Sequence, residues 1–250
     1  MSPHETFGFM ASTFRIDPRF RGPPASGNGG YVAGLLAREL GGFGCTVTLK
    51  APPPLDVDLR VDRAGDGVSL WFGDRLVADA APSETDIAVP PPPTFAAAAD
   101  AERRFSGLRD HVFPGCFVCG PDRAVGDGMR IFAGSLGQPG QTAVACRWHA
   151  DASLADNDGL LRSEFVWAAL DCPGYFAVQD SAGPAVLGRL AVVLCGNLPV
   201  VCEPMIVTGW PIESNGRKHR VGTALHSADG TLRAFAQGTW ISINAPDWQE

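Results

Sequence analysis

Two segments of the chain share one pattern of residue types. Residues 31–37 read Tyr-Val-Ala-Gly-Leu-Leu-Ala, and residues 165–171 read Phe-Val-Trp-Ala-Ala-Leu-Asp. At a constant offset of 134 positions (165 − 31), six positions agree in character, and the seventh pairs Ala37 with Asp171. Apolar residues recur at helical spacing, so each copy predicts a helix. A duplicated helix restricts the fold strongly, because it predicts the same structural unit twice in one chain.

The first copy lies in a segment with clear helix boundaries. Asn28-Gly29-Gly30 precedes a predicted helix over Tyr31–Leu40, and Gly41-Gly42 follows as a C-terminal stop. The small residues of this helix would let it lie close against a sheet. Gly73-Asp74 marks a hairpin turn between the last two of the strands predicted next. These strands are Thr46–Leu49, Val57–Val61, Val68–Phe72 and Leu76–Ala78.

The second half repeats this order. A helix is predicted over Ser163–Phe176, interrupted at Pro173-Gly174, and Ala228–Gly230 marks the final turn. The strands predicted around it are Met129–Phe132, Thr142–Trp148, Leu187–Leu194, Met205–Trp210, His219–His226 and Leu232–Ile243. The chain then divides into a first unit over 1–85, a linker over 86–112 and a second unit over 113–250.

The linker is rich in proline and alanine. Pro90–Pro93 cannot form a central strand, and no helix-start signal precedes Thr94. A short helix is predicted only later, around Ala101–Leu108.

Composition narrows the classes of protein. Charged residues make up only 19% of the chain, with 30 Gly and 21 Pro, which favours a sheet-rich fold with many turns. A net charge of −7 argues against nonspecific nucleic-acid binding, but a few local cations could still bind an anionic small ligand. No segment approaches the roughly 20 apolar residues that span a bilayer, and Met1–Thr6 lacks the features of a secretory signal. Seven cysteines, an odd number, fit a reducing compartment, so we expect a cytoplasmic protein without membrane partners.

Three parts of the sequence resemble the hotdog-fold acyl-CoA thioesterase superfamily, in particular the phenylacetate-pathway type. They are Asn28–Ala37, then Cys116–Pro121 with Gly126–Met129, and finally Gly216–Lys218 with Ala228–Gly230 and Thr239-Trp240. The resemblance implies an α+β double hotdog, with two curved antiparallel sheets each wrapped around a central helix. It covers most of 10–85 and 113–245, through short motifs.

In that family each active site combines a helix start from one unit with a carboxylate from the other. The first helix keeps Asn28-Gly29-Gly30 but has Ala37 at the carboxylate position, whereas the second has Asp171 there and Arg162–Glu164 at its start. The resemblance therefore implies one complete site, Asn28-Gly29-Gly30 facing Asp171. The pseudo-symmetric site, which keeps neither part, should be inactive.

The residue types of the complete site suit thioester hydrolysis. A helix N-terminus offers free N–H groups to an oxyanion, and Gly29 and Gly30 allow close approach because they lack Cβ. Asn28 either donates a hydrogen bond or only caps the helix. Asp171 would be base or nucleophile, unless it is a structural residue of the adjacent turn. Glu164 lies seven residues before it on the same helical face and could assist, or only complement the helix dipole.

Two further groups of residues invite a binding role. Cys116 and Cys119 form a close pair, but no second pair completes a zinc site and His111 and His149 lack suitable spacing. Structural cysteines without metal are therefore favoured, and Cys172 is interpreted as a small buried residue. The densest basic run contains Arg217, Lys218 and Arg220, which could bind the phosphates of coenzyme A or only protect a strand edge.

The predicted function is hydrolysis of an acyl-CoA or related acyl thioester at one cross-unit site. The alternative is a noncatalytic protein of the same fold that binds acyl-CoA or acyl-carrier thioesters. A hydratase is a weaker alternative, because the Asp and His pair at the helix spacing of such hydratases is missing. The coenzyme A thioester would be the substrate, no resident cofactor is expected, and a homodimer of double hotdogs is possible.

Overall fold

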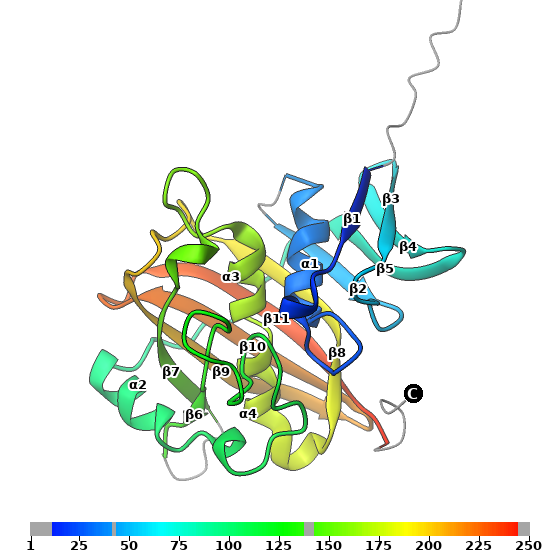
Figure 1. Ribbon diagram of the computed structural model, residues 1–250. Coiled ribbons are helices and arrows are strands. Elements are labelled where there is room, and N and C mark those ends of the chain that lie inside the picture. The colour runs from blue at the N-terminus through cyan, green and yellow to red at the C-terminus, as the bar shows by residue number, and fades with distance from the viewer. Residues whose placement is uncertain (1–11, 42–43, 138–142, 245–250) are drawn as a thin grey trace, which may run out of the picture.

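A computed structural model describes residues 12–41, 44–137 and 143–244 (Figure 1). Met1–Thr6, Gly42 and Thr142, which carried parts of the sequence-based predictions, lie outside these ranges. The helices are α1 (Gly29–Arg38), α2 (Phe95–Glu102), α3 (Ser163–Ala169) and α4 (Cys172–Ala182), with 3-10 turns η1 (Pro18–Phe20), η2 (Ser106–Leu108) and η3 (Ala152–Leu154). The strands are β1 (Ser12–Arg15), β2 (Gly44–Leu49), β3 (Asp58–Ala64), β4 (Gly67–Phe72), β5 (Arg75–Pro82), β6 (Gly134–Ser135), β7 (Val144–His149), β8 (Ala185–Leu194), β9 (Pro204–Asn215), β10 (Lys218–Ser227) and β11 (Leu232–Ser242).

The described strands form one antiparallel sheet in the order β1-β3-β4-β5-β2-β8-β11-β10-β9-β7-β6. The strands of each half are contiguous in it, and β2 pairs with β8 where the halves meet, for example at Val47 and Leu190. The expectation of two separate sheets is wrong in this respect, because the pairing of β2 with β8 satisfies the backbone groups that two facing edges would leave exposed. Helix α1 packs on the β2–β5 side, and α4 packs on β9–β11 (Figure 1).

The second predicted helix breaks earlier than its proline suggests. Helix α3 ends at Ala169, Asp171 has a ψ of −80°, and α4 begins at Cys172. Pro173 lies in the first turn of α4, where the missing N–H costs nothing. The break leaves Asp171 at the junction between two helices instead of inside one.

Two local predictions are wrong. Met129–Phe132 is not a strand, although its backbone donates hydrogen bonds from Met129 to Phe117 and from Ile131 to Val118. In the linker, α2 begins earlier than expected, because the hydroxyl of Thr94 accepts a hydrogen bond from the N–H of Ala97 and caps the alanine run.

Gly30 and Gly34 of α1 face the other helix instead of the sheet, whereas Gly29 faces Leu49 of β2 and Leu187 of β8. A Cβ added to Gly34 would lie 2.6 Å from Glu164 Cα and 2.8 Å from Trp167 Cβ. A Cβ added to Gly30 would lie 2.5 Å from Asp171 Cβ. The two repeated helices therefore cross in direct backbone contact, which only glycine permits. None of the helices in the described ranges has both the length and the hydrophobicity that crossing a lipid bilayer requires.

Candidate functional site

The helix crossing brings Asn28, Gly30 and Asp171 together. Asp171 Oδ2 accepts a hydrogen bond of 2.9 Å from the backbone N–H of Gly30 and another of 2.9 Å from Asn28 Nδ2. Asn28 and Asp171 are 3% and 2% exposed. The structure thus joins the start of α1 in the first half to the α3–α4 junction in the second, as the resemblance implied, while the catalytic roles of these residues stay a prediction.

Burial dominates the electrostatics of Asp171. Desolvation raises the pKa of its carboxyl to about 7, and Cys116 adds to the increase, while the hydrogen bonds from Gly30 and Asn28 oppose it. Among the described residues none donates a hydrogen bond to the second carboxylate oxygen, Oδ1. One oxygen is therefore fixed by two donors, and the other retains its full capacity to accept a proton.

Asn28 performs both of the functions that the sequence left open. Its Oδ1 accepts a hydrogen bond of 2.9 Å from the N–H of Tyr31 and caps α1, while its Nδ2 donates to Asp171. The N–H of Gly30 is also directed at Asp171, so neither donor is free to polarise a substrate carbonyl in this arrangement. Gly29 is less buried, and its N–H belongs to the first turn of α1, whose N–H groups have no partner within the helix.

Glu164 lies at the pseudo-symmetric position. The offset of 134 pairs it with Gly30 (164 − 30), and its side chain is 2% exposed. Its Oε1 lies 3.1 Å from Arg38 NH1 at the end of α1 and 3.7 Å from Arg162 Nε. At this end of the crossing, Glu164 and Arg38 thus form an ion pair, whereas the other end pairs Gly30 with the carboxylate of Asp171. This supports the structural interpretation of Glu164, and an assisting role in catalysis stays an untested prediction.

Three cysteine side chains converge beside the site. The sulfur atoms of Cys116, Cys119 and Cys172 all lie within 4.8 Å of one another, and all three residues are buried. Asn28 Nδ2 lies 3.8 Å from Cys116 Sγ and 4.0 Å from Cys172 Sγ. Hydrogen bonds from the thiols of Cys119 and Cys172, and from the backbone N–H groups of Cys119 and Val118, lower the pKa of Cys116 although burial opposes the shift.

Sequence reasoning missed this cluster because Cys172 follows Cys116 by 56 positions. The helix break that positions Asp171 also positions its neighbour Cys172. The available signal was the adjacency of Asp171 and Cys172 in a chain that also carries a Cys-x-x-Cys motif.

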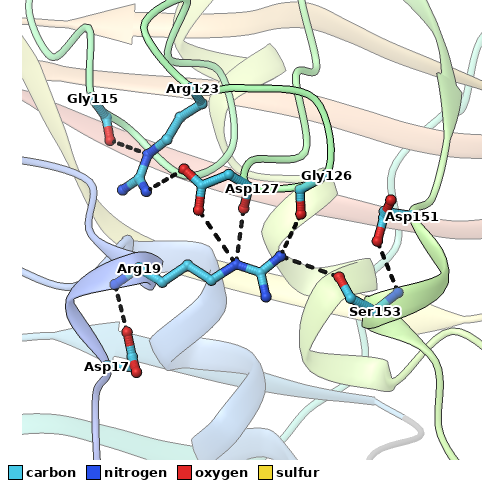
Figure 2. A network of polar contacts seen from close by, with 8 residues as sticks. All are labelled: Asp17, Arg19, Gly115, Arg123, Gly126, Asp127, Asp151 and Ser153. Atoms are coloured by element: carbon cyan, nitrogen blue, oxygen red, sulfur yellow. Dashed lines mark hydrogen bonds and ion pairs between the residues drawn. The ribbon is translucent and has the colours of Figure 1, made fainter.

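Arg19 holds the loop of the second unit that carries Cys116 and Cys119 against the first unit. Figure 2 shows its side chain reaching from η1 toward Gly126, Asp127 and Ser153. Its guanidinium donates hydrogen bonds of 2.9 Å to the carbonyl oxygens of Gly126 and Asp127 and one of 3.2 Å to Ser153 Oγ. This network explains how a loop that begins the second unit comes to lie beside Asn28.

The predicted phosphate-binding residues separate in the structure. Lys218 and Arg220 line a groove of about 500 Å³, together with Arg189, which sequence reasoning missed. Arg217 does not line it and instead donates a hydrogen bond of 3.0 Å to the carbonyl oxygen of Ser242. Arg220 pairs with Glu213 at 3.0 Å, so its charge is partly compensated.

The groove approaches the site through one residue. Leu49 lines the groove, and its Cδ1 lies 3.0 Å from where a Cβ of Gly29 would be. The side chain of Leu187 lies 3.1 Å from the same point. Two leucines therefore cover the start of α1, and one of them, Leu49, also lines the groove.

No protein-family model matches the sequence, and no curated protein matches it closely. Solved structures resemble the chain over nearly their full length. A hot dog fold protein of unknown function from Alicyclobacillus acidocaldarius has 10% identity and a TM-score of 0.61, covering 95% of this chain and 94% of that one. A Thermobifida fusca protein provisionally named thioesterase II has 16% identity and a TM-score of 0.61, covering 93% of each chain. The tesB protein of Mycobacterium avium subsp. paratuberculosis has 13% identity and a TM-score of 0.58, covering 87% and 88%. At these identities the likeness shows the fold, and it confirms the predicted resemblance to hotdog-fold thioesterases at that level.

Proposed function

We propose that this protein hydrolyses the thioester bond of an acyl-CoA or related acyl thioester at a single site between its two halves. The observation that carries the proposal is the buried carboxylate of Asp171, held on one oxygen by Asn28 and Gly30 and without a hydrogen-bond partner among the described residues on the other. The fold shared with solved thioesterases supports it.

In the proposed mechanism each atom of the site has a task. Oδ2 of Asp171 is fixed by its two donors, so the plane of the carboxylate is set before substrate binds. Oδ1 takes the proton of a water molecule that attacks the thioester carbonyl, or attacks that carbonyl itself. The N–H of Gly29, at the positive end of the α1 dipole, stabilises the oxyanion. The C–S bond then breaks, and the coenzyme A thiolate leaves with the proton that Asp171 took from water. Where Oδ1 attacks directly, a water molecule hydrolyses the resulting acyl-aspartate anhydride and supplies that proton.

The substrate reaches this site past Leu49 and Leu187. Asp171 is only 2% exposed, so the two leucine side chains must rotate to admit the acyl group beside Gly29. Because both side chains are apolar, they also favour an apolar acyl chain.

Release of free thiol from a panel of acyl-CoAs, detected with a thiol-trapping reagent, tests the hydrolase activity. The variant Asn28→Asp tests whether the site between the two halves is responsible for it. Aspartate caps a helix as well as asparagine does, but it offers no N–H to Asp171 and brings a second carboxylate to 2.9 Å from it. We expect a loss of about 10²-fold or more in kcat/KM with α1 still formed. Wild-type activity in the variant would exclude Asn28 from the mechanism. The thermal unfolding curve of the variant is the control: an unchanged Tm means that the helix cap is kept and only the N–H donor is lost.

The groove is the proposed binding surface for the nucleotide end of coenzyme A. Reversing charge with Lys218→Glu or Arg189→Glu should raise KM for an acyl-CoA about fivefold to tenfold, because each exposed phosphate contact contributes near 1 kcal/mol. The KM for an acyl-N-acetylcysteamine thioester, which has no phosphates, should not change. Arg217→Glu is the matched control, since it makes the same charge change outside the groove. An equal effect of Arg217→Glu would indicate general attraction by the basic run.

A noncatalytic binder is the second candidate, and one observation favours it. Two of the three candidate donors to a substrate carbonyl, Asn28 Nδ2 and the N–H of Gly30, are occupied by Asp171 itself. A binder of the same fold would show thermal stabilisation by acyl-CoA without release of free thiol. Turnover of any acyl-CoA in the panel, lost in the Asn28 variant, decides for the hydrolase.

A further inference from the structure

Three buried thiols with no disulfide among them are arranged as metal ligands. Cys116 Sγ and Cys172 Sγ are 3.9 Å apart, and Cys119 Sγ lies within 4.8 Å of both. A tetrahedral zinc ion with Zn–S bonds near 2.3 Å places its sulfur ligands about 3.8 Å apart. We propose that Cys116, Cys119 and Cys172 together bind a zinc ion, next to the proposed catalytic site and independently of its chemistry.

The loop around Cys116 is shaped for this role. The N–H of Gly120 donates a hydrogen bond of 2.9 Å to the carbonyl of Cys116, so the Cys-x-x-Cys segment forms a tight turn. A Cβ on Gly120 would lie 2.4 Å from the carbonyl oxygen of Pro114 and 2.5 Å from that of Cys116, so only glycine fits. The turn aims both sulfur atoms toward Cys172 at the start of α4.

Hydrogen-bond donors surround the cluster as an outer shell. The backbone N–H groups of Val118 and Cys119 donate to Cys116 Sγ, and Asn28 Nδ2 lies within 4.0 Å of both Cys116 Sγ and Cys172 Sγ. Such donors orient sulfur ligands and offset the negative charge that thiolates bring to a metal. Three thiolates and one Zn²⁺ have a net charge of −1, and the N–H donors around the cluster stabilise that negative charge.

The fourth ligand is a water molecule. Among the described residues, the possible ligand atoms that gather within 4.8 Å of one another here are the three sulfur atoms alone. The ring of His111 is held elsewhere, because its Nδ1 accepts a hydrogen bond of 3.0 Å from the N–H of Phe113. The ion would join the loop of residues 113–128 to the α3–α4 junction and thereby fix the residue that follows Asp171.

Metal content of the purified protein tests the proposal without reference to activity. Untagged protein, prepared without chelators, should contain one zinc per chain by elemental mass spectrometry. Cys116→Ser, Cys119→Ser and Cys172→Ser should each lose most of it. Cys146→Ser is the matched control, because Cys146 is equally buried but lies outside the cluster, and it should retain full occupancy.

A second measurement does not depend on whether the cysteine variants fold. Wild-type protein stripped with a chelator and given Co²⁺ should develop the intense near-ultraviolet absorption of sulfur-to-cobalt charge transfer, and Zn²⁺ should displace it. His111→Ala should leave that absorption in place, because the three sulfur ligands remain. Protein with no bound metal, no cobalt absorption and either three reduced thiols or a Cys116–Cys172 disulfide would overturn the proposal.

Discussion

Asp171→Asn is expected to lower kcat/KM for acyl-thioester hydrolysis by about 10²–10⁴-fold, the contribution of a positioned general base. Asparagine matches aspartate in shape, and its Oδ1 can accept the same hydrogen bonds from Gly30 and Asn28. It cannot accept a proton from water. The measurement is initial rate against substrate concentration for the best acyl-CoA of the panel.

The same variant should not unfold more easily than the wild type. Asp171 is buried, and among the described residues nothing donates to its Oδ1, so removing its charge removes a desolvation cost. The expected pair of results is therefore lost activity with an equal or higher Tm. Activity that persists in Asp171→Asn would exclude it as base or nucleophile, and activity lost together with the fold would mark it as structural.

Gly34→Ala is expected to destabilise the protein by about 1–3 kcal/mol or more, the usual result of overpacking a core. The new Cβ would lie 2.6 Å from Glu164 Cα, a backbone atom that can move only if α3 moves. The higher helix propensity of alanine would gain at most about 1 kcal/mol in return. Chemical denaturation of the purified variant measures the difference.

Gly29→Ala provides the comparison within the same helix. The three atoms nearest to its added Cβ would be Leu49 Cδ1 at 3.0 Å and Leu187 Cβ and Cδ2 at 3.1 Å, so no backbone atom is among them and both Cδ atoms can move by side-chain rotation. We expect a smaller loss of stability than for Gly34→Ala. Equal losses in the two variants would show that helix α1 tolerates separation from α3, contrary to the close crossing described here.

The repeated pattern correctly predicted a helix at the corresponding place in each half, α1 and α3. Residues 31–37 and 165–171 are similar because both lie at one crossing, where apolar and small side chains are required on the same face. The position of Asp171 opposite Asn28 and Gly30 followed from the family resemblance and is present in the structure. Strands β2 to β5 and β7 to β11 were found because alternating apolar residues and turn signals are local properties.

Features that depend on long-range packing were missed. Pro173 indicated a helix break, but the predicted break came three residues too late. The prediction treated proline as a helix breaker, whereas Pro173 lies in the first turn of α4. Cys172 was assigned a packing role, since no local spacing connects it to Cys116 and Cys119. Arg189 lines the groove because β8, β11 and β10 are neighbours in the sheet, and the sequence alone did not show this strand order.

The presence of both halves in one chain has a consequence for how they could diverge. In a dimer of identical units every substitution appears twice, so a change that improves one half-site is imposed on the other. In this chain, a residue of one half can be substituted without changing its counterpart in the other half. A carboxylate could be lost at position 37, which is now Ala37. Another could be gained at position 164, where Glu164 pairs with Arg38, while Gly30 and Asp171 stayed unchanged. One end of the helix crossing was thereby free to specialise in holding the halves together, and the other in the proposed chemistry.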